Sequence, residues 1–335
     1  MLENAKWIAS DADVRAVCPL FVRTFRAEKP VSAATLEITA RGVYEARLNG
    51  RRVGEFVLAP GWTEYETRIQ VQTYDAAPLL SMGENLLEIT LASGWYIGRI
   101  SHRTDYVPGK PAESGRYPAV IARLHIVYAD GTAGTVLTDR SWLTAESSLA
   151  PCDIYDGQRF DASRAPAGFV PASEIDAPTD DLVPQIGEEE RAAETIRARR
   201  ILKTPKGETV VDFGQNLTGV PEITVNAKAG DLVKLSFAEI LDGDGNFYND
   251  NYRSAKAVFE YVCRDGVQTY RPTLTFYGFR YLRVDAFPGS VTPEAFTAVV
   301  LHSDMRRTGY IETDDAQLNR LVENVVWGQK GNYLD

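Results

Sequence analysis

Two tryptophan-containing stretches carry the side chains best suited to bind a sugar. The first, A-P-G-W-T-E-Y, contains Trp62 and Glu64, and the second, S-G-W-Y-I-G, contains Trp95 and Tyr96. Aromatic rings beside bends that glycine permits can form a flat face against the C–H groups of a sugar. The alternative is that Trp62 and Trp95 are core residues at the corners of a β-fold, because large aromatic side chains are usually well buried.

Acidic residues near these stretches can supply hydrogen-bond acceptors. Asp105 follows the second stretch, and its carboxylate can accept hydrogen bonds from sugar hydroxyls. Asp156 belongs to D-I-Y-D-G-Q-R-F-D, whose three carboxylates can bind a cation or sugar hydroxyls. Asp and Gly are also common turn formers, so a loop or turn role competes with binding at both positions. The candidate carbohydrate-binding residues are therefore Trp62, Glu64, Trp95, Tyr96, Asp105 and Asp156.

A further acidic stretch has the spacing of calcium ligands but departs from the calcium-binding pattern. Asp242, Asp244 and Asn246 recur at i, i+2 and i+4. However, Phe247 stands where an EF-hand loop needs Gly, and Arg253 stands where it needs a bidentate Glu. A hairpin tip accounts for the stretch, so we predict no metal site here. The sequence also lacks a P-loop, a G-x-S-x-G motif and a dinucleotide-binding fingerprint, and we expect no cofactor.

The elements that would position these residues are short strands. From residue 16 to 308 the chain shows short alternating runs, with turn signals about every 8–12 residues. Asn49-Gly50, Asp130-Gly131 and Asp265-Gly266 are two-residue turn signals of the kind that close hairpins. This pattern predicts β-sandwiches or jelly rolls rather than βαβ units.

A segment rich in proline and acidic residues divides the strands into two series. We expect an N-terminal β-sandwich at 1–165, an ordered connection at 166–198 and a second β-sandwich at 199–308. With about 150 residues per domain, a chain of 335 residues is long enough for two domains. The remainder, 309–335, is expected to form a single helix. The predicted fold class is all-β with one C-terminal helix.

The stretch 313–335 is the clearest amphipathic helix in the sequence, with Thr313 or Asp314 as its expected N-cap. Five apolar residues recur on one face at i, i+3, i+4, i+7 and i+8, namely Leu318, Leu321, Val322, Val325 and Val326. Such a stripe must be buried against other elements, most naturally helices. Either the helix folds back onto its own sheet, or the chain is cut just inside a helical domain. We favour the second interpretation.

The amino-acid composition disfavours some classes of binding partner and cellular location. The chain is 44% hydrophobic and 24% charged, as in ordinary globular proteins, and its net charge of −10 disfavours nucleic acid or an anionic membrane as a partner. It has neither an apolar run of ~20 residues nor a signal-peptide pattern at its start. Its three cysteines are scattered, which favours reduced thiols over a disulfide framework. We therefore expect a cytoplasmic location.

Four motifs in the first half of the chain, taken in order, resemble one known domain. They are L-N-G-x-x-V-G at 48–54, P-G-W-T-x-Y at 60–65, G-W-Y-x-G at 94–98 and I-Y-D-G-Q at 154–158. The set resembles the N-terminal, carbohydrate-binding-like β-domain of the bacterial α-L-rhamnosidases, glycoside hydrolase family 78.

The second half continues the same resemblance. D-F-G-Q-N at 212–216 and T-F-Y-G-F-R-Y at 275–281 resemble the concanavalin-like domain that follows in that family. Residues 318–335 resemble the opening of its (α/α)6 barrel, so the C-terminal helix would begin that barrel. The ordered set covers nearly the whole chain.

The resemblance implies hydrolysis of terminal α-L-rhamnosyl groups with inversion and without an organic cofactor. Inverting glycosidases use two carboxyl groups ~6.5–9.5 Å apart, and in this family both lie in the helical barrel, beyond Asp335. We therefore assign no catalytic residue and expect the chain as given to be inactive. Some relatives hold rhamnose through calcium, but no calcium ligand is assigned here.

Three hypotheses follow for the role of the chain. It is the N-terminal accessory region of an α-L-rhamnosidase, or a binding module for rhamnose or another sugar, or a purely structural region that supports the barrel or forms a homodimer interface. The expected partners are a rhamnosylated glycoside or free rhamnose and the missing helical catalytic domain, with no nucleic acid and no membrane.

Overall fold

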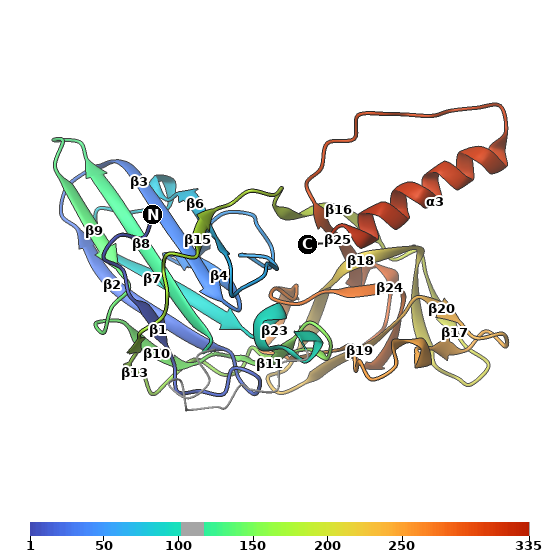
Figure 1. The fold of residues 1–335 in the computed structure, drawn as a ribbon. Coiled ribbons are helices and arrows are strands. Elements are labelled where there is room, and N and C mark those ends of the chain that lie inside the picture. The colour runs from blue at the N-terminus through green and yellow to red at the C-terminus, as the bar shows by residue number, and fades with distance from the viewer. Residues whose placement is uncertain (102–116, 335) are drawn as a thin grey trace. The chain divides into compact units, whose positions relative to one another are not determined.

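Strands form nearly all of the regular structure of this protein. The structure is a computed structural model that describes residues 1–101 and 117–334 (Figure 1). The predicted fold class, all-β with a C-terminal helix, is confirmed. No helix in the described part of the chain is long and apolar enough to cross a membrane.

The chain divides into two compact units that interleave in sequence. The first comprises Met1–Tyr155 and Arg164–Gly187, and the second comprises Asp156–Ser163 and Glu188–Asp335. The predicted connection, 166–198, therefore contributes residues to both units.

The first unit contains two sheets, as expected for a β-sandwich. One sheet has the order β14-β1-β8-β3-β6-β15 with β9 beside β8, and its strands are β1 (Trp7–Ala9), β3 (Val31–Arg41), β6 (Ile69–Asp75), β8 (Ala119–Tyr128), β9 (Ala133–Leu137), β14 (Ser173–Ile175) and β15 (Leu182–Pro184). The other has the order β13-β10-β2-β7-β4-β5, with β2 (Pro19–Ala27), β4 (Val43–Leu48), β5 (Arg51–Arg52), β7 (Gly83–Ala92), β10 (Leu143–Glu146) and β13 (Val170–Pro171). The unit also contains the short helix α1 (Gly94–Ile97) and the strand β11 (Leu149–Asp153).

Local sequence accounts for much of this unit. Asn49 and Gly50 have φ angles of 54° and 75°, the left-handed conformation that a tight hairpin turn requires, and they join β4 to β5 as predicted. Along β7 the side chains of Leu87, Ile89 and Leu91 are at most 1% exposed and alternate with half-buried residues. This period of two places one face of the strand in the core.

The second unit is built from one curled sheet. Its order is β12-β22-β19-β24-β18-β25-β16, with β17 and β23 also beside β18. The strands are β12 (Gly157–Asp161), β16 (Glu190–Arg197), β17 (Arg200–Lys203), β18 (Thr209–Ala227), β19 (Leu232–Ala238), β22 (Val258–Val262), β23 (Gly266–Tyr270), β24 (Tyr277–Ala286) and β25 (Phe296–Ser303). A small hairpin, β20 (Ile240–Leu241) with β21 (Phe247–Tyr248), lies beyond β19.

The long strand β18 explains the curl of this sheet. Its first half pairs with β17 and β24, and its second half pairs with β23 and β25. A register shift between Asp212 and Leu217 marks an irregularity that bends the strand. The prediction that Asp265-Gly266 closes a hairpin is wrong, because β22 pairs with β19 whereas β23 pairs with β18.

Stacked aromatic rings fill the interior of the second unit. The Phe237 and Tyr277 rings stack with centroids 3.7 Å apart, and the Phe279 ring meets Phe237 edge-on at 5.2 Å. Phe237 and Phe279 are fully buried. These contacts tie β19 to β24 and give the curled sheet its core.

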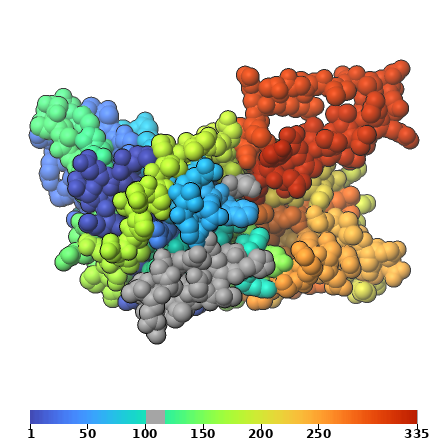
Figure 2. Space-filling view, in the orientation of Figure 1, coloured from blue at the N-terminus to red at the C-terminus, as the bar shows by residue number. Residues whose placement is uncertain are grey.

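The C-terminal helix α3 (Ala316–Asn332) belongs to the second unit. Its N-cap is Asp315, whose Oδ1 accepts hydrogen bonds from the Gln317 and Leu318 N–H groups at 2.7 and 3.2 Å. The cap is thus one residue later than predicted, while Thr313 supports it by accepting the Asp315 N–H group at 3.2 Å. Residues 304–315, which we call the strap, arch outward from β25 before the chain returns as α3 (Figures 1 and 2).

Candidate functional site

Trp62 and Glu64 lie on an ordered, exposed loop of the first unit, between β5 and β6. The side chain of Trp62 is 60% exposed, and Glu64 is also exposed. The Thr63 hydroxyl donates to the Arg68 carbonyl at 2.6 Å, and the Arg68 N–H group donates to the Glu64 carbonyl at 2.9 Å. These bonds hold the loop closed, so the indole ring is presented to solvent on a fixed support.

Trp95 and Tyr96 lie on α1 and are buried, with 7% and 3% of their surface exposed. The Tyr96 ring meets the Tyr65 ring edge-on, with centroids 5.1 Å apart. This contact brings the two tryptophan-containing stretches together. Gly94 permits the tight entry into α1, because it has a φ of +51° and a Cβ there would lie 2.6 Å from a Val43 methyl group.

Asp153 anchors the end of the second tryptophan stretch, a role that the sequence did not indicate. Its Oδ2 accepts the Arg99 N–H group at 2.9 Å, and its Oδ1 accepts the Tyr155 N–H group at 2.7 Å. The Arg99 guanidinium lies over the Tyr155 ring at 5.4 Å. The only signal was the position of Asp153 at the head of an acidic turn, which is not specific for such a contact.

The two remaining candidates are Asp156 and Asp105. Asp156 belongs to the second unit, where its carboxylate lies 3.3 Å from the Lys256 ammonium group and its carbonyl accepts the Val258 N–H group at 3.1 Å. Asp105 lies outside the described residues. Sugar contact by the six candidates stays a prediction.

The acidic stretch with calcium-like spacing forms the tip between β20 and β21. Asp242 Oδ1 accepts the N–H groups of Asn246 and Asp244 at 2.7 and 3.0 Å. The backbone hydrogen bond from Asn246 is the largest cause that lowers the pKa of Asp242. Within residues 1–101 and 117–334, no group of three or more His, Cys, Asp or Glu side chains is arranged to hold a metal ion.

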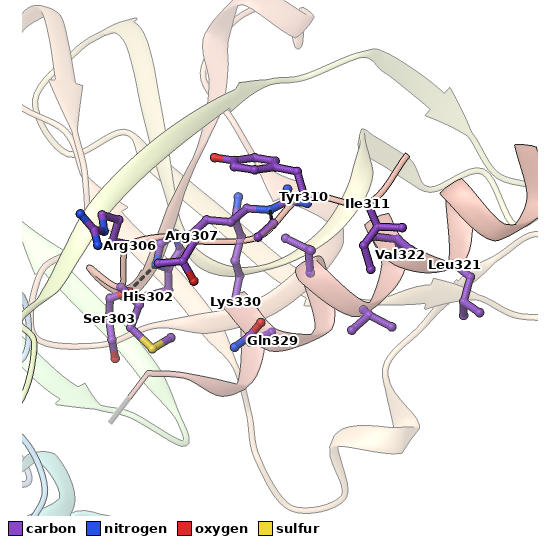
Figure 3. A pocket seen from close by; sticks show the side chains of 15 residues that line it. His302, Ser303, Arg306, Arg307, Tyr310, Ile311, Leu321, Val322, Gln329 and Lys330 are labelled. Atoms are coloured by element: carbon purple, nitrogen blue, oxygen red, sulfur yellow. Dashed lines mark hydrogen bonds between the residues drawn. The ribbon is translucent and has the colours of Figure 1, made fainter. Parts of the chain in front are cut away.

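A row of exposed apolar side chains in the second unit lies along α3. None of its residues is buried, and Leu321 and Val325 are 57% and 61% exposed. A groove of about 620 Å³ runs between the helix and the strap (Figure 3). Its lining includes Met305, Tyr310, Ile311, Leu321, Val322, Val325 and Val326.

The C-terminal end of α3 is fixed to the curled sheet. The Thr218 hydroxyl donates to the Gly331 carbonyl at 3.0 Å, and the Ser303 N–H group donates to the Tyr333 carbonyl at 2.8 Å. Lys330 forms an ion pair with Glu194 on β16. The helix therefore touches its own sheet at one end, while Leu318, Leu321 and Val325 of its apolar stripe remain exposed.

Basic side chains border this groove. The Arg307 guanidinium lies over the Tyr310 ring at 4.4 Å, and the Lys330 ammonium group lies over the Trp327 ring at the same distance. Arg306 also lines the groove. A partner that fills it would need an apolar face and would benefit from acidic groups at its edge.

Comparison with known proteins identifies both units. Residues 29–199 match the family described as Alpha-L-rhamnosidase N-terminal domain, and residues 202–302 match the Bacterial alpha-L-rhamnosidase concanavalin-like domain. The α-L-rhamnosidase of Streptomyces avermitilis is 38% identical over 91% of this chain and 30% of its own length. That of an Alteromonas species is 34% identical over all of this chain and 39% of its own length.

Solved structures give the same result. The crystal structure of the Aspergillus terreus α-L-rhamnosidase matches 99% of this chain and 40% of its own, with 32% identity and a TM-score of 0.91. The Streptomyces avermitilis enzyme, solved in complex with L-rhamnose, matches 96% of this chain and 32% of its own, with a TM-score of 0.87. The chain thus spans less than half the length of these relatives. With an N-terminal domain match over half of its residues, it belongs to the α-L-rhamnosidase family.

Proposed function

We propose that this chain is the N-terminal accessory region of an inverting α-L-rhamnosidase, and that it has no hydrolytic activity by itself. The whole enzyme would remove terminal α-L-rhamnosyl groups from glycosides, with both catalytic carboxyl groups in a helical domain that follows these β-domains. A cytoplasmic location is part of the same proposal.

The exposed stripe of α3 is the observation that supports this proposal most directly. Fully burying one Leu or Val side chain stabilises a protein by about 1.5–3 kcal/mol. The helix leaves Leu318, Leu321 and Val325 at least 43% exposed, and so forgoes roughly half of that stabilisation. Further helices packed against the stripe and the adjoining groove would recover it. The match to only 30–39% of the curated relatives leaves room for such a domain in the enzyme.

Hydrolysis of a nitrophenyl α-L-rhamnoside tests the proposal. We would compare this chain with a version extended through the rest of the reading frame, at equal concentration and with both shown to be folded by circular dichroism. We expect nitrophenol release only from the longer protein. Release by the short chain at a comparable rate would mean that a pair of carboxyl groups among the β-domains performs the reaction, and the proposal would be abandoned.

Sugar binding is a second candidate function, favoured by the exposure of Trp62 on its closed loop. Stacking of a rhamnose ring on this indole would make Trp62→Ala weaken binding without lowering the melting temperature. Met82→Ala is the matched control, because Met82 is an apolar side chain of the same unit that is 72% exposed. Titration with millimolar rhamnose, with and without calcium, measures both. No signal for the unmodified chain at these concentrations would remove this candidate.

Homodimerisation is the third candidate, and it also rests on α3. If a second copy covered the stripe, sedimentation would show dimers at micromolar concentration, and Leu321→Ser would shift them to monomers. A chain that stays monomeric throughout would leave the helical domain as the expected partner.

A further inference from the structure

A cleft opens in the side of the first unit, between the edges of its two sheets. Strand β10 pairs with β2 only from Pro19 to Val22, so the rest of β2 has a free edge among the described strands. Strand β9 pairs only with β8 and forms an edge of the other sheet. Residues of β2, β8 and β9 line a cleft of about 330 Å³. This volume is near the lower limit for small-molecule sites, roughly 300–1,000 Å³, and so suits a compact ligand.

Strand register points two side chains of β2 toward this cleft. Arg23 lies opposite Leu87 on β7, and Phe25 lies opposite Asn85. Leu87 and Asn85 are buried, and residues directly opposite one another in an antiparallel pair share a face of the sheet. Arg23 and Phe25 therefore project between the two sheets, yet both are only half-buried because they lie beside the open edge.

The wall on the other sheet leaves room for a ligand. Tyr128 follows the buried Ile126 by two residues on β8, so its ring lies on the same face of the sheet. Gly134 lies opposite Ile126 on β9, and a Cβ at Gly134 would lie 3.0 Å from the Tyr128 hydroxyl oxygen. Glycine thus leaves the tyrosine its space. The cleft has one aromatic side chain on each sheet, Phe25 and Tyr128.

The described part of the chain supplies no counter-ion for Arg23. Its Nη1 donates to the Ser141 carbonyl at 3.0 Å, and no carboxylate of the described residues forms an ion pair with it. Asp139, which also lines the cleft, accepts the Ser141 N–H group through Oδ1 at 2.8 Å. Arg26, a more exposed lining residue, is paired with Glu28 at 3.0 Å. Arg23 is therefore a half-buried cation whose remaining N–H groups can bind an anion.

We propose that this cleft binds a sugar acid, that is, a compound of monosaccharide size whose ring carries a carboxylate. Arg23 receives the carboxylate, because a guanidinium binds this group through two parallel hydrogen bonds. The Phe25 and Tyr128 rings contact the C–H groups of the sugar ring. The Asp139 carboxylate and the Tyr128 hydroxyl bind its hydroxyl groups. The site does not include Trp62, and it does not depend on the proposed function of the chain.

Titration calorimetry of the full chain of 335 residues with glucuronate tests the proposal. We expect saturable binding at millimolar ligand that weakens as the salt concentration rises, because it depends on a charge pair. Glucuronamide, in which an amide replaces the carboxylate, should bind at least about tenfold more weakly. Rhamnose, which has no carboxylate, should not displace glucuronate. Absence of glucuronate binding, or equal binding of glucuronate and glucuronamide, would overturn the proposal.

Substitution of Arg23 locates the site. Arg23→Met keeps a long apolar stem but removes the guanidinium, and it should weaken glucuronate binding at least about tenfold. Arg51→Met is the matched control and should bind normally, since Arg51 belongs to the same unit and also donates from Nη1 to one carbonyl, that of Pro78 at 3.0 Å. Unchanged binding by folded Arg23→Met would refute the assignment. If this variant does not fold, the comparison of glucuronate with glucuronamide on the unmodified chain decides.

Discussion

Asp212 and Asp181 are both acidic residues in contact with arginine, yet the fold treats them very differently. The Asp212 side chain is 1% exposed, and it accepts hydrogen bonds from Arg280 Nε at 2.9 Å, from Arg200 Nη2 at 3.0 Å and from the Gly214 N–H group at 2.8 Å. Burial alone would raise the pKa of Asp212, but the bonds from Arg280, Gly214 and Arg200 together hold it below its usual value.

The Asp181 pair in the first unit lacks such hydrogen bonds. Arg41 Nη2 lies 3.8 Å from Asp181 Oδ2, too far for a hydrogen bond, although the two side chains are only 7% and 12% exposed. Arg41 Nε and Asp181 Oδ1 are buried without a hydrogen-bond partner among the described residues. Burial raises the pKa of Asp181, and the Arg41 charge opposes this only in part. The Arg41 guanidinium also lies over the Trp7 ring, at 5.1 Å.

The difference teaches that strand register positions charged partners better than a connecting segment does. Register places Arg200 directly opposite Asp212 on β17, and it places Arg280 beside the residue opposite Asp212 on β24. Asp181, in contrast, reaches Arg41 from the segment just before β15, which pairs in parallel with β6. Each buried charge pays for desolvation, and only complete hydrogen bonding offsets that cost.

The largest effect is expected at Asp212. Asp212→Ala should lower the free energy of unfolding by about 2–4 kcal/mol, because it removes a buried carboxylate that accepts hydrogen bonds from three residues. Urea unfolding of the whole chain measures this. Arg200→Ala is the control, with an expected loss below about 1 kcal/mol since the Arg200 side chain is 60% exposed. Equal losses for the two variants would contradict the special role of the carboxylate.

A smaller effect on stability is expected at the Arg41–Asp181 pair, which lacks hydrogen bonds between its side chains. The double variant Arg41→Met with Asp181→Leu should lie within about 1 kcal/mol of the unmodified chain, because apolar replacement of a buried ion pair is often neutral or stabilising. The single variant Arg41→Met should lose about 1–3 kcal/mol, since it leaves the Asp181 carboxyl without its cation. Urea unfolding again compares them. A double variant as unstable as Asp212→Ala would erase the contrast between the two sites.

Lowering the pH should change the contributions of Asp212 and Asp181 to stability in opposite directions. The lowered pKa of Asp212 means that its stabilising contribution is complete above the usual Asp value near 3.9 and is lost as the pH falls through the lowered value. The raised pKa of Asp181 means that its cost is complete above the raised value and disappears as the pH falls below the usual one. Unfolding at several pH values between about 3 and 7 tests this.

We expect the advantage of the unmodified chain over Asp212→Asn to shrink toward acid pH. The unmodified chain should instead improve relative to Asp181→Asn over the same interval. Parallel changes for both variants would show that the two carboxyl groups titrate alike.

The smallest effect is expected on the open stripe of α3. Leu321→Ser should change the stability of this chain by at most about 0.5 kcal/mol, because the side chain is 57% exposed. Leu282→Ala on β24 is the matched control, with an expected loss of about 2–5 kcal/mol at a fully buried position. Thermal unfolding of both variants measures the contrast. A large loss for Leu321→Ser would mean that the stripe is already satisfied within this chain.

Two predictions that depend on adjacent residues were confirmed, although the one for Asp265-Gly266 was wrong. The Asn49-Gly50 hairpin and the helix around Leu321 were predicted correctly, since backbone preference and periodicity act within a few residues. The exposure of the candidate binding residues could not be predicted from the sequence. Trp62 and Trp95 have similar sequence surroundings, yet one is exposed and the other is buried. Which ring a fold covers depends on contacts that the local sequence does not contain.

By itself, the sequence determined the all-β class, the two strand series, the C-terminal amphipathic helix and the resemblance to a glycosidase family. Tertiary structure alone decided that β22 and β23 pair with different strands on either side of Asp265-Gly266, and that the Asp212 carboxylate receives hydrogen bonds from Arg280, Arg200 and Gly214. The physical reason is that strand partners are chosen by burial and register across long stretches of chain, and these choices leave no local mark in the residues themselves.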